Sequence, residues 1–291
     1  MDLTERILKD YSLYLKIERA MSPNTVASYS SDVKEFFSLE SAAPADVSTQ
    51  DVIDCLSSRG NLSKRSQARF LSSLRSFFDW LVLEGERKDN PCDPIDSPKI
   101  GHYLPSVLSV EEVEAIMASV DLSSPIGKRD RAILEVLYGC GLRVSEAAGL
   151  KISCIYLDES FVRVIGKGNK ERIVPMGEPA VSAVSEYLAV RPDPASADFD
   201  DILFLNRFGK SLSRVSMFNI VKRQAMLAGI HKEISPHTFR HSFATHLIEN
   251  GADLRVVQDM LGHENITTTE IYTHIDTSTW QQSVLSHHPR R

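Results

Sequence analysis

Cysteine is scarce in this sequence, which contains four in 291 residues. The four are far apart, and no two have the C-x-x-C spacing of a metal or redox site. A chain of this length has enough apolar residues to fill its cores without disulfide bonds. We therefore predict that all four thiols are reduced and structural: Cys55, Cys92, Cys140 and Cys154.

Long hydrophobic runs are also absent. No stretch of about eighteen apolar residues occurs, so the sequence contains no candidate for a transmembrane helix. The N-terminus, from Met1 to Arg6, carries acidic side chains where a secretory signal peptide needs basic residues followed by an apolar run. We therefore expect no membrane association and a cytoplasmic location.

The chain has no excess of positive charge, since its formal net charge is -6. A negative chain usually argues against nucleic acid, because phosphate binding depends on Lys and Arg side chains that displace counterions. Net charge is a sum over all faces, however, and DNA contacts only one of them. Composition therefore leaves nucleic-acid binding open, and the motifs have to decide.

Motifs for nucleotides and catalytic zinc are missing as well. No G-x-x-x-x-G-K-[ST] loop occurs, so we expect no nucleotide cofactor. His237 and His241 have the i, i+4 spacing of zinc ligands, but H-E-x-x-H is absent and Arg240 between them would repel a cation. We therefore predict neither a metal nor another cofactor.

The first ninety residues have the apolar periodicity of helices. Ser22-Pro23 is typical of a helix start, and Ser48 with Asp51 forms a capping-box pattern. Four helices are predicted, around residues 3–15, 22–37, 51–56 and 63–85. We predict a compact all-α domain over residues 1–90.

A proline-rich segment follows, and its composition predicts an interdomain linker over residues 91–104. The second domain, residues 105–291, contains an alternating stretch at residues 160–175 that predicts a β-hairpin with Lys167 at its tip. Its predicted helices start after residue 109 and cover residues 129–138, 214–228, 236–250 and 254–261. The expected fold is therefore mainly α with a small antiparallel β-sheet in the second domain.

The most specific motif is Ser-Pro-His-Thr-Phe-Arg-His at residues 235–241. Its serine and proline place His237 and Arg240 in the opening turn of a helix, three residues apart on one face. The N–H groups of a helix start attract phosphate, and a guanidinium adds a clamp for two phosphate oxygens. The pair is a candidate phosphate site, although taken alone it fits equally well with a surface arginine beside a structural histidine.

Two more residues of interest lie close to the C-terminus. His263 follows a helix that ends in glycine, and Tyr272 lies on a segment that Thr267 and Glu270 mark as a capped helix start. Taken alone, such a tyrosine usually packs in a core, and such a histidine is usually solvated. The order of all the motifs along the chain changes this interpretation.

That order resembles the tyrosine recombinase (phage integrase) family, and the resemblance covers nearly the entire chain. The motifs are G-L-R-V-S-E at 141–146, G-K-G-N-K-E-R at 166–172, H-x-x-R at 237–240, L-G-H at 261–263, and Tyr272. The nearest form is the Xer group, which resolves chromosome dimers at dif-type sites during cell division and chromosome segregation. Residues 251–258 and the tail at 287–290 resemble the XerD type more than the XerC type.

The resemblance implies a helical core-binding (SAM-like) domain and a catalytic domain that together form a C-shaped clamp around duplex DNA. It implies that Tyr272 attacks a backbone phosphate, releases a 5'-hydroxyl and holds the DNA as a 3'-phosphotyrosyl ester. A second 5'-hydroxyl reverses the step without ATP, and religation to a different strand gives recombination. The implied catalytic residues are Arg143, Lys167, His237, Arg240, His263 and Tyr272.

The chemistry explains these residue types, because a phenol with a pKa of about 10 has to lose its proton as it attacks an anionic phosphodiester. By residue match, Arg143 and Arg240 hold the non-bridging oxygens and stabilise the transition state. Lys167 protonates the departing oxygen as general acid, unless it is an ordinary turn lysine. His237 and His263 share the roles of proton acceptor and phosphate donor, and the sequence leaves open which does which.

Basic residues outside the catalytic set are candidates for the DNA track, and each is also compatible with a solvated helix face. We expect their phosphate contacts to outnumber base contacts. These candidates are Lys64, Arg65 and Arg69 in the first domain and Lys222 and Arg223 in the second.

The resemblance also implies partners: double-stranded DNA, a tetramer on two sites, a second Xer recombinase of the XerC type, and an FtsK-type translocase as activator. The segment from Thr277 onward resembles the helix by which family members contact a neighbouring protomer. A mobile-element integrase is an alternative with the same chemistry, although many such enzymes carry an additional arm-binding domain. A second alternative, from a different class of protein, is an architectural DNA-binding protein that keeps the clamp and has lost catalysis.

Overall fold

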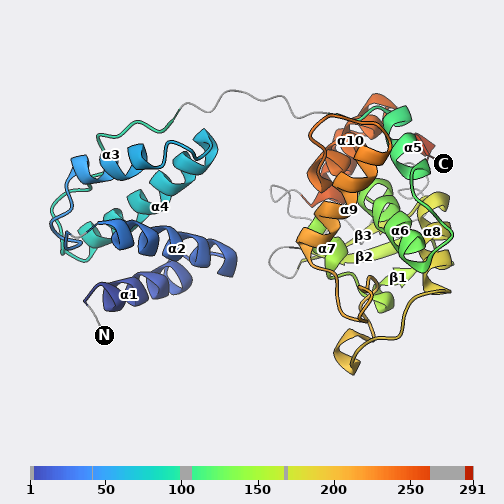
Figure 1. The fold of residues 1–291 in the computed structure, drawn as a ribbon, viewed down its shortest axis with the longest axis horizontal. Coiled ribbons are helices and arrows are strands. Elements are labelled where there is room, and N and C mark those ends of the chain that lie inside the picture. The colour runs from blue at the N-terminus through green and yellow to red at the C-terminus, as the bar shows by residue number, and fades with distance from the viewer. Residues whose placement is uncertain (1–2, 41, 99–106, 167–169, 263–285, 291) are drawn as a thin grey trace. The chain divides into compact units, whose positions relative to one another are not determined.

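The computed structural model describes residues 3–40, 42–98, 107–166, 170–262 and 286–290. The chain divides into two units, Met1–Tyr103 and Leu104–Arg291 (Figure 1). Each unit has its own hydrophobic core. In the described part of the chain, no helix is both long and apolar enough to cross a membrane. All four cysteines are buried and none is in a disulfide, as their scattered spacing predicts.

The N-terminal unit consists of the helices α1 (Leu3–Ile17), α2 (Pro23–Leu39), α3 (Thr49–Ser58) and α4 (Lys64–Leu83). Serine side chains cap α2, α3 and α4 by accepting a backbone N–H of the first turn, and α3 has the full capping box that its sequence predicts. The prediction of four helices and no strand is confirmed for the described residues of this unit.

Aromatic side chains fill the centre of this unit. Tyr11 of α1 meets Phe77 of α4 edge-on, with ring centroids 5.1 Å apart, and Phe36 of α2 meets Phe78 in the same way at 6.3 Å. All four are fully buried. Such rings bury large apolar areas and favour edge-to-face contact, so α4 is held against both α1 and α2.

The first part of the predicted linker belongs to the N-terminal unit. Cys92 is fully buried, and its carbonyl accepts a hydrogen bond of 3.1 Å from Arg75 of α4. Arg75 also donates to the carbonyl of Ile95 at 2.9 Å, while the Asn90 side chain donates to the carbonyl of Arg75 at 3.0 Å. These bonds continue the packed structure beyond α4, although the local sequence has no helical period.

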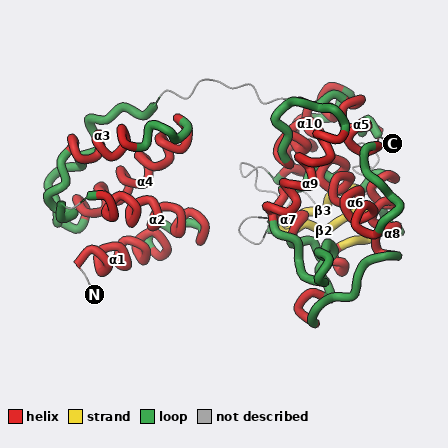
Figure 2. The backbone as a smooth tube through the Cα atoms, viewed as in Figure 1, coloured by secondary structure: helices red, strands yellow, loops and turns green. Residues whose placement is uncertain are grey.

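The C-terminal unit is mainly helical (Figure 2). Much of one helix is buried inside it. Every residue from Ala132 to Leu142 is buried, and most of them belong to the helix α6. This helix packs against α8 and α10. The helices are α5 (Val110–Ala118), α6 (Pro125–Gly139), α7 (Val144–Ala148), α8 (Glu178–Leu188), α9 (Arg214–Leu227), α10 (Pro236–Glu249) and α11 (Leu254–Leu261), with 3-10 turns at Ile152–Cys154 and Ala197–Phe199.

The sheet of this unit has three antiparallel strands in the order β1 (Ile155–Tyr156), β2 (Phe161–Ile165) and β3 (Glu171–Pro175). The β2–β3 hairpin and the mainly helical class are confirmed as predicted. Strand β1 was not predicted, because two residues are too short for an alternating pattern. Helices α7 and α8 were not predicted either, and their N-caps, Arg143 and Gly177, make no side-chain capping hydrogen bond.

The C-terminal residues 286–290 dock on the rest of the C-terminal unit. His288 is 4% exposed and contacts the rings of Tyr138 in α6 and Phe243 in α10, with centroid distances of 5.6 and 5.7 Å. Arg290 donates to the buried carboxylate of Glu135 at 2.7 Å. The segment that begins at Thr277, which resembles a protomer-contacting helix, lies outside the described residues as far as Leu285.

This docking generates a pH prediction. Burial, together with the charges of Arg290 and His246, lowers the pKa of His288 to about 4 from its ordinary 6.5. Because the unfolded chain binds the proton at a higher pH than the folded protein, the stabilising effect of neutral His288 is complete above pH 6.5 and is lost towards pH 4. The free energy of unfolding should fall by roughly 1.4 kcal/mol per pH unit in this window from this group alone.

His288→Phe provides the comparison. It keeps the ring contacts but loses the hydrogen bond of 3.0 Å that Nδ1 of His288 accepts from the backbone N–H of Arg290. That loss lowers the free energy of unfolding at neutral pH, whereas the absence of a titrating ring changes its pH dependence. Denaturation measured between pH 7 and 5 should show a shallower pH dependence for the variant than for the parent protein. Equal pH dependence of the two proteins would contradict this account of His288.

Candidate active site

Three segments of the C-terminal unit meet through arginine side chains. Arg240 of α10 donates to the carbonyl of Gly141 at 2.7 Å and to that of Leu261. Arg143 donates to the carbonyl of Gly262 at 3.1 Å. The start of α7, the first turns of α10 and the end of α11 therefore lie against one another, although about 120 residues separate Gly141 from Gly262.

The start of α10 has the capped geometry that its motif predicts. Ser235 is the N-cap and accepts a hydrogen bond of 3.3 Å from the backbone N–H of Thr238, with Pro236 in the first turn. The helix then directs two functional candidates differently: His237 is exposed, whereas Arg240 is 8% exposed. Arg240 is therefore set into the protein beside α11, and His237 faces solvent.

Glu146 lies at the centre of the arginine cluster, a role that the motifs alone did not predict. Its buried carboxylate accepts hydrogen bonds from both terminal nitrogens of Arg172, each at 2.8 Å. It also accepts one from Arg143 Nη1 at 2.9 Å and one from the Arg143 backbone N–H at 2.8 Å, and it lies 4.0 Å from Arg240 Nη1. One signal was present in the sequence, since a glutamate three residues after a helix N-cap is a capping-box position.

The electrostatics of the cluster favour an anion. Burial by itself would raise the pKa of Glu146, but the hydrogen bonds and charge of Arg172 outweigh it, so this pKa lies below its ordinary value. Burial, followed by the charge of Arg143, lowers the pKa of Arg240 to about 10, which leaves it protonated at neutral pH. Three guanidinium groups around one carboxylate leave an excess of positive charge, and the Arg143 side chain remains 34% exposed.

Three predicted catalytic residues, Lys167, His263 and Tyr272, lie outside the described residues. The described neighbours of two of them border the cluster. Gly166 precedes Lys167, Gly262 precedes His263, and both glycines lie close to the Arg172 guanidinium. A Cβ atom on either glycine would lie 3.5 Å from Arg172 Nη1. Among the predicted catalytic residues, the structure thus brings Arg143 and Arg240 together and places His237 on the same helix as Arg240.

Two family models match the chain: the phage integrase family over residues 106–279, and the phage integrase N-terminal SAM-like domain over residues 8–85. The chain belongs to the phage integrase family. Tyrosine recombinase XerD of Chlorobaculum tepidum is 46% identical to it over 297 residues, which cover 98% of this chain and 97% of the relative.

Solved structures agree with this assignment. The crystal structure of XerA recombinase is 32% identical and superposes with a TM-score of 0.51, covering 99% of this chain and 100% of that one. XerH site-specific recombinase, bound to a palindromic difH substrate, shares the fold at 23% identity with a TM-score of 0.69, covering 97% and 96%. This family member is therefore a tyrosine recombinase of the Xer type, as its motif order indicates.

The five residues of this recombinase that are candidates for DNA contact are all exposed. Two of them form ion pairs with buried carboxylates. In the N-terminal unit, Arg69 donates to both oxygens of Asp32, at 2.5 and 3.0 Å. In the C-terminal unit, Arg223 donates to Asp130 at 2.5 Å. Asp32 and Asp130 are 5% and 0% exposed, so each fixes a half-exposed guanidinium at the surface. The other three candidates are Lys64, Arg65 and Lys222.

The exposed face of α9 is also partly apolar, which the sequence analysis missed. Val215 is 68% exposed and Phe218 is 42% exposed, one turn before the exposed Lys222. A face that mixes cations with apolar side chains suits contact with a nucleic-acid groove, where phosphates and base edges lie together.

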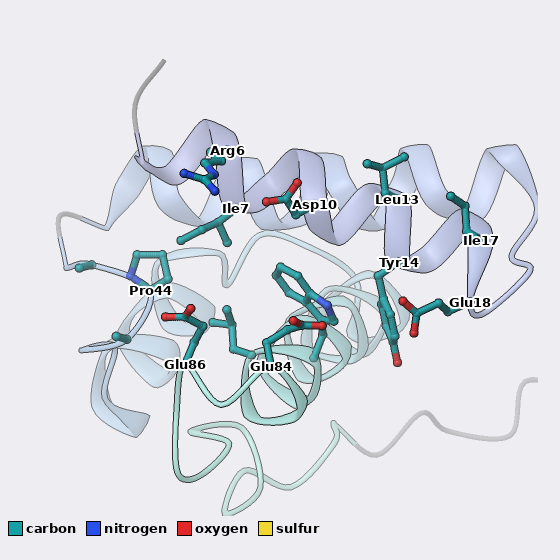
Figure 3. A pocket seen from close by; sticks show the side chains of 14 residues that line it. Arg6, Ile7, Asp10, Leu13, Tyr14, Ile17, Glu18, Pro44, Glu84 and Glu86 are labelled. Atoms are coloured by element: carbon teal, nitrogen blue, oxygen red, sulfur yellow. The ribbon is translucent and has the colours of Figure 1, made fainter.

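A recess of about 560 Å³ in the N-terminal unit has the opposite character (Figure 3). It lies beside α1 and the end of α4, and Trp80 and Tyr14 contribute to its apolar lining. Four carboxylates line the recess, and Arg6 is the single cation among the lining residues. The carboxylates are Asp10, Glu18, Glu84 and Glu86. This surface would repel phosphate, so the recess is not a candidate DNA site. No cluster suited to a metal ion occurs among the described residues.

The two buried carboxylates generate a stability prediction. Arg69→Ala leaves Asp32 with the Ser73 hydroxyl as its remaining side-chain partner, whereas Arg223→Ala leaves Asp130 paired with Arg129 at 2.7 Å. Because an unpaired buried charge is costly but the lost arginine is half-exposed, Arg69→Ala should lower the free energy of unfolding by about 1 to 3 kcal/mol. Arg223→Ala should cost less than about 1 kcal/mol. Calorimetry of both variants measures the difference, and equal losses would contradict it.

Proposed function

We propose that this recombinase cuts and rejoins duplex DNA through a 3'-phosphotyrosyl intermediate on Tyr272, and that it resolves chromosome dimers at a dif-type site during cell division and chromosome segregation. The observation that carries the proposal is the convergence of Arg143 and Arg240, from segments about 100 residues apart, in a cluster with excess positive charge. The XerD relatives support the role in chromosome segregation.

The reaction follows from the residue types. The Tyr272 oxygen attacks the scissile phosphorus while the bond from phosphorus to the 5'-oxygen breaks, so one phosphodiester replaces another and no external energy source is required. Arg143 and Arg240 hold the non-bridging oxygens and stabilise the charge that grows on them in the transition state. The exposed 34% of the Arg143 side chain supports its contact with a phosphate outside the protein.

Two protons move during the step. The phenol proton of Tyr272 passes to a base, and the exposed His237 on α10 is the described residue that suits this role. Lys167 supplies a proton to the departing 5'-oxygen, and His263 hydrogen-bonds the phosphate. Their described neighbours Gly166 and Gly262 border the arginine cluster, which supports both assignments.

The assembly we propose is a tetramer on two double-stranded DNA sites in the cytoplasm, with a XerC-type recombinase as second subunit and an FtsK-type translocase as activator. A helical core-binding domain over residues 1–90, a linker over 91–104 whose first residues pack on that domain, and a catalytic domain over 105–291 would together clamp the duplex. Lys64, Arg65 and Arg69 would contact phosphates from the first domain, and Lys222 and Arg223 from the second.

The nucleophile is tested with Tyr272→Phe. Purified protein is incubated with a nicked suicide duplex that carries a chromosomal recombination site, with and without the second recombinase and the translocase. The parent protein should form a band that resists denaturation, with the DNA attached to the peptide containing Tyr272. The variant should bind the site with unchanged affinity and form no such band, because phenylalanine has no attacking oxygen. A covalent adduct retained by the variant would exclude Tyr272, and binding without an adduct in every mixture would favour an architectural protein.

The DNA track is tested by the salt dependence of binding. Each lost phosphate contact should reduce the slope of log affinity against log salt by about 0.9. We expect that reduction for Arg69→Ala and for Arg223→Ala, measured by fluorescence anisotropy. Lys9→Ala, an exposed lysine of α1, is the matched control and should leave the slope unchanged. Unchanged slopes in both arginine variants would mean that their pairs with aspartate serve the fold alone.

A further inference from the structure

Arg172 occupies an unusual position on β3. Buried and less buried residues alternate along this strand: Arg172 and Val174 are buried, and Glu171 and Ile173 are not. Arg172 therefore lies on the face of the strand that an apolar side chain normally occupies. It is 7% exposed. Burying a guanidinium is costly unless its donors are paired, and a well-packed apolar residue often serves stability as well or better. Such a residue therefore calls for a role beyond filling the core.

All three kinds of nitrogen in the Arg172 guanidinium are used. Nη1 and Nη2 each donate to one oxygen of Glu146 at 2.8 Å, and Nε donates to the carbonyl of Met260 at 2.7 Å. The first pair is a fork on α7, and the third bond reaches the last turn of α11. Arg172 therefore connects α7 to the end of α11, the two segments that contact the arginines Arg143 and Arg240.

The fork determines where the Glu146 carboxylate lies, and Glu146 in turn holds Arg143. Oε1 accepts from Arg143 Nη1 and Oε2 from the Arg143 backbone N–H, so both oxygens are shared between Arg143 and Arg172. At the other end, the Met260 carbonyl is followed in the chain by the Leu261 carbonyl, which accepts from Arg240, and by the Gly262 carbonyl, which accepts from Arg143.

We propose that Arg172 is a positioning residue for DNA cleavage: through Glu146 and the end of α11 it holds Arg143 in the orientation that meets the scissile phosphate. The inference rests on the proposed function. Arg172 itself does not touch DNA. Its loss allows the Glu146 carboxylate to turn towards Arg143 alone, which draws the Arg143 guanidinium away from the phosphate and weakens charge stabilisation in the transition state.

The test compares two suicide duplexes in single-turnover cleavage at saturating protein. One has the natural phosphodiester at the cleavage site, and the other has a methylphosphonate, in which a methyl group replaces one non-bridging oxygen. The methylphosphonate carries no negative charge, so it depends less on arginine. Strand cleavage is the measurement, and melting temperature and site affinity are recorded for each protein.

Arg172→Met, which keeps the length of the side chain, should cleave the natural duplex about 100-fold more slowly, as misplacement of a catalytic group by about 1 Å can produce. On the methylphosphonate the deficit should shrink by about tenfold or more. Arg143→Ala is the reference that should show the same substrate dependence. Arg163→Met is the matched control, since Arg163 lies on the neighbouring strand, is 39% exposed and pairs with Glu171; it should stay within about twofold of the parent on both duplexes.

Two further variants test the same proposal if Arg172→Met does not fold. They are Arg172→Lys and Glu146→Gln. Lysine keeps the charge but cannot form the fork, so it should restore only part of the natural rate. The effect of Glu146→Gln should not add to that of an Arg172 variant, because both act through Arg143. Equal slowing on both duplexes, or cleavage of the natural duplex at the parent rate, would overturn the proposal and leave Arg172 a structural residue. Failure of the parent protein to cleave with its partners present would instead refute the proposed function.

Discussion

The arginine cluster of the C-terminal unit depends on the buried carboxylate of Glu146. Arg143 and Arg172 both donate to it, and Arg240 lies 4.0 Å from it. Without a central negative charge, three guanidinium groups would repel one another in a region that solvent screens poorly. Other donors of these arginines go to the backbone carbonyls of Gly141, Met260, Leu261 and Gly262, at or beside helix ends, where carbonyls lack an intrahelical partner. The hydrogen bonds that satisfy these guanidinium groups therefore also position the helices.

The cluster is neutralised only in part, and this matters for its chemistry. A fully compensated arginine would have little attraction for a phosphate, whereas an uncompensated buried one would destabilise the fold. One carboxylate among three guanidinium groups leaves positive charge available at the partly exposed Arg143. Asp32 and Asp130 apply a related solution at the surface, where each holds a half-exposed arginine whose charge it offsets but whose side chain it orders.

Predictions based on local pattern were the most successful part of the sequence analysis. Helix starts at Ser48, Ser109 and Ser235 have the predicted caps, because a cap is a bond between residues three apart. The hairpin followed from alternation in β2 and β3. By contrast, α8 was not predicted although Ala180, Val184 and Tyr187 form an apolar stripe, and its N-cap, Gly177, has no side chain to form a capping hydrogen bond. Residues 91–95 were assigned to a linker, yet Arg75 holds them on α4 through backbone carbonyls that no side-chain pattern reports.

By itself, the sequence determined the family, the order of the motifs, the helical class with its hairpin, and the arginines that a phosphate requires. These features depend on residue type and on neighbours a few positions away. Only the tertiary structure decided that Glu146 and Arg172 belong to the site, that His237 is exposed while Arg240 is buried, and that aspartates lie beneath Arg69 and Arg223. Their partners are distant in the chain, and the burial that makes each pairing necessary exists only once the helices and the sheet have packed.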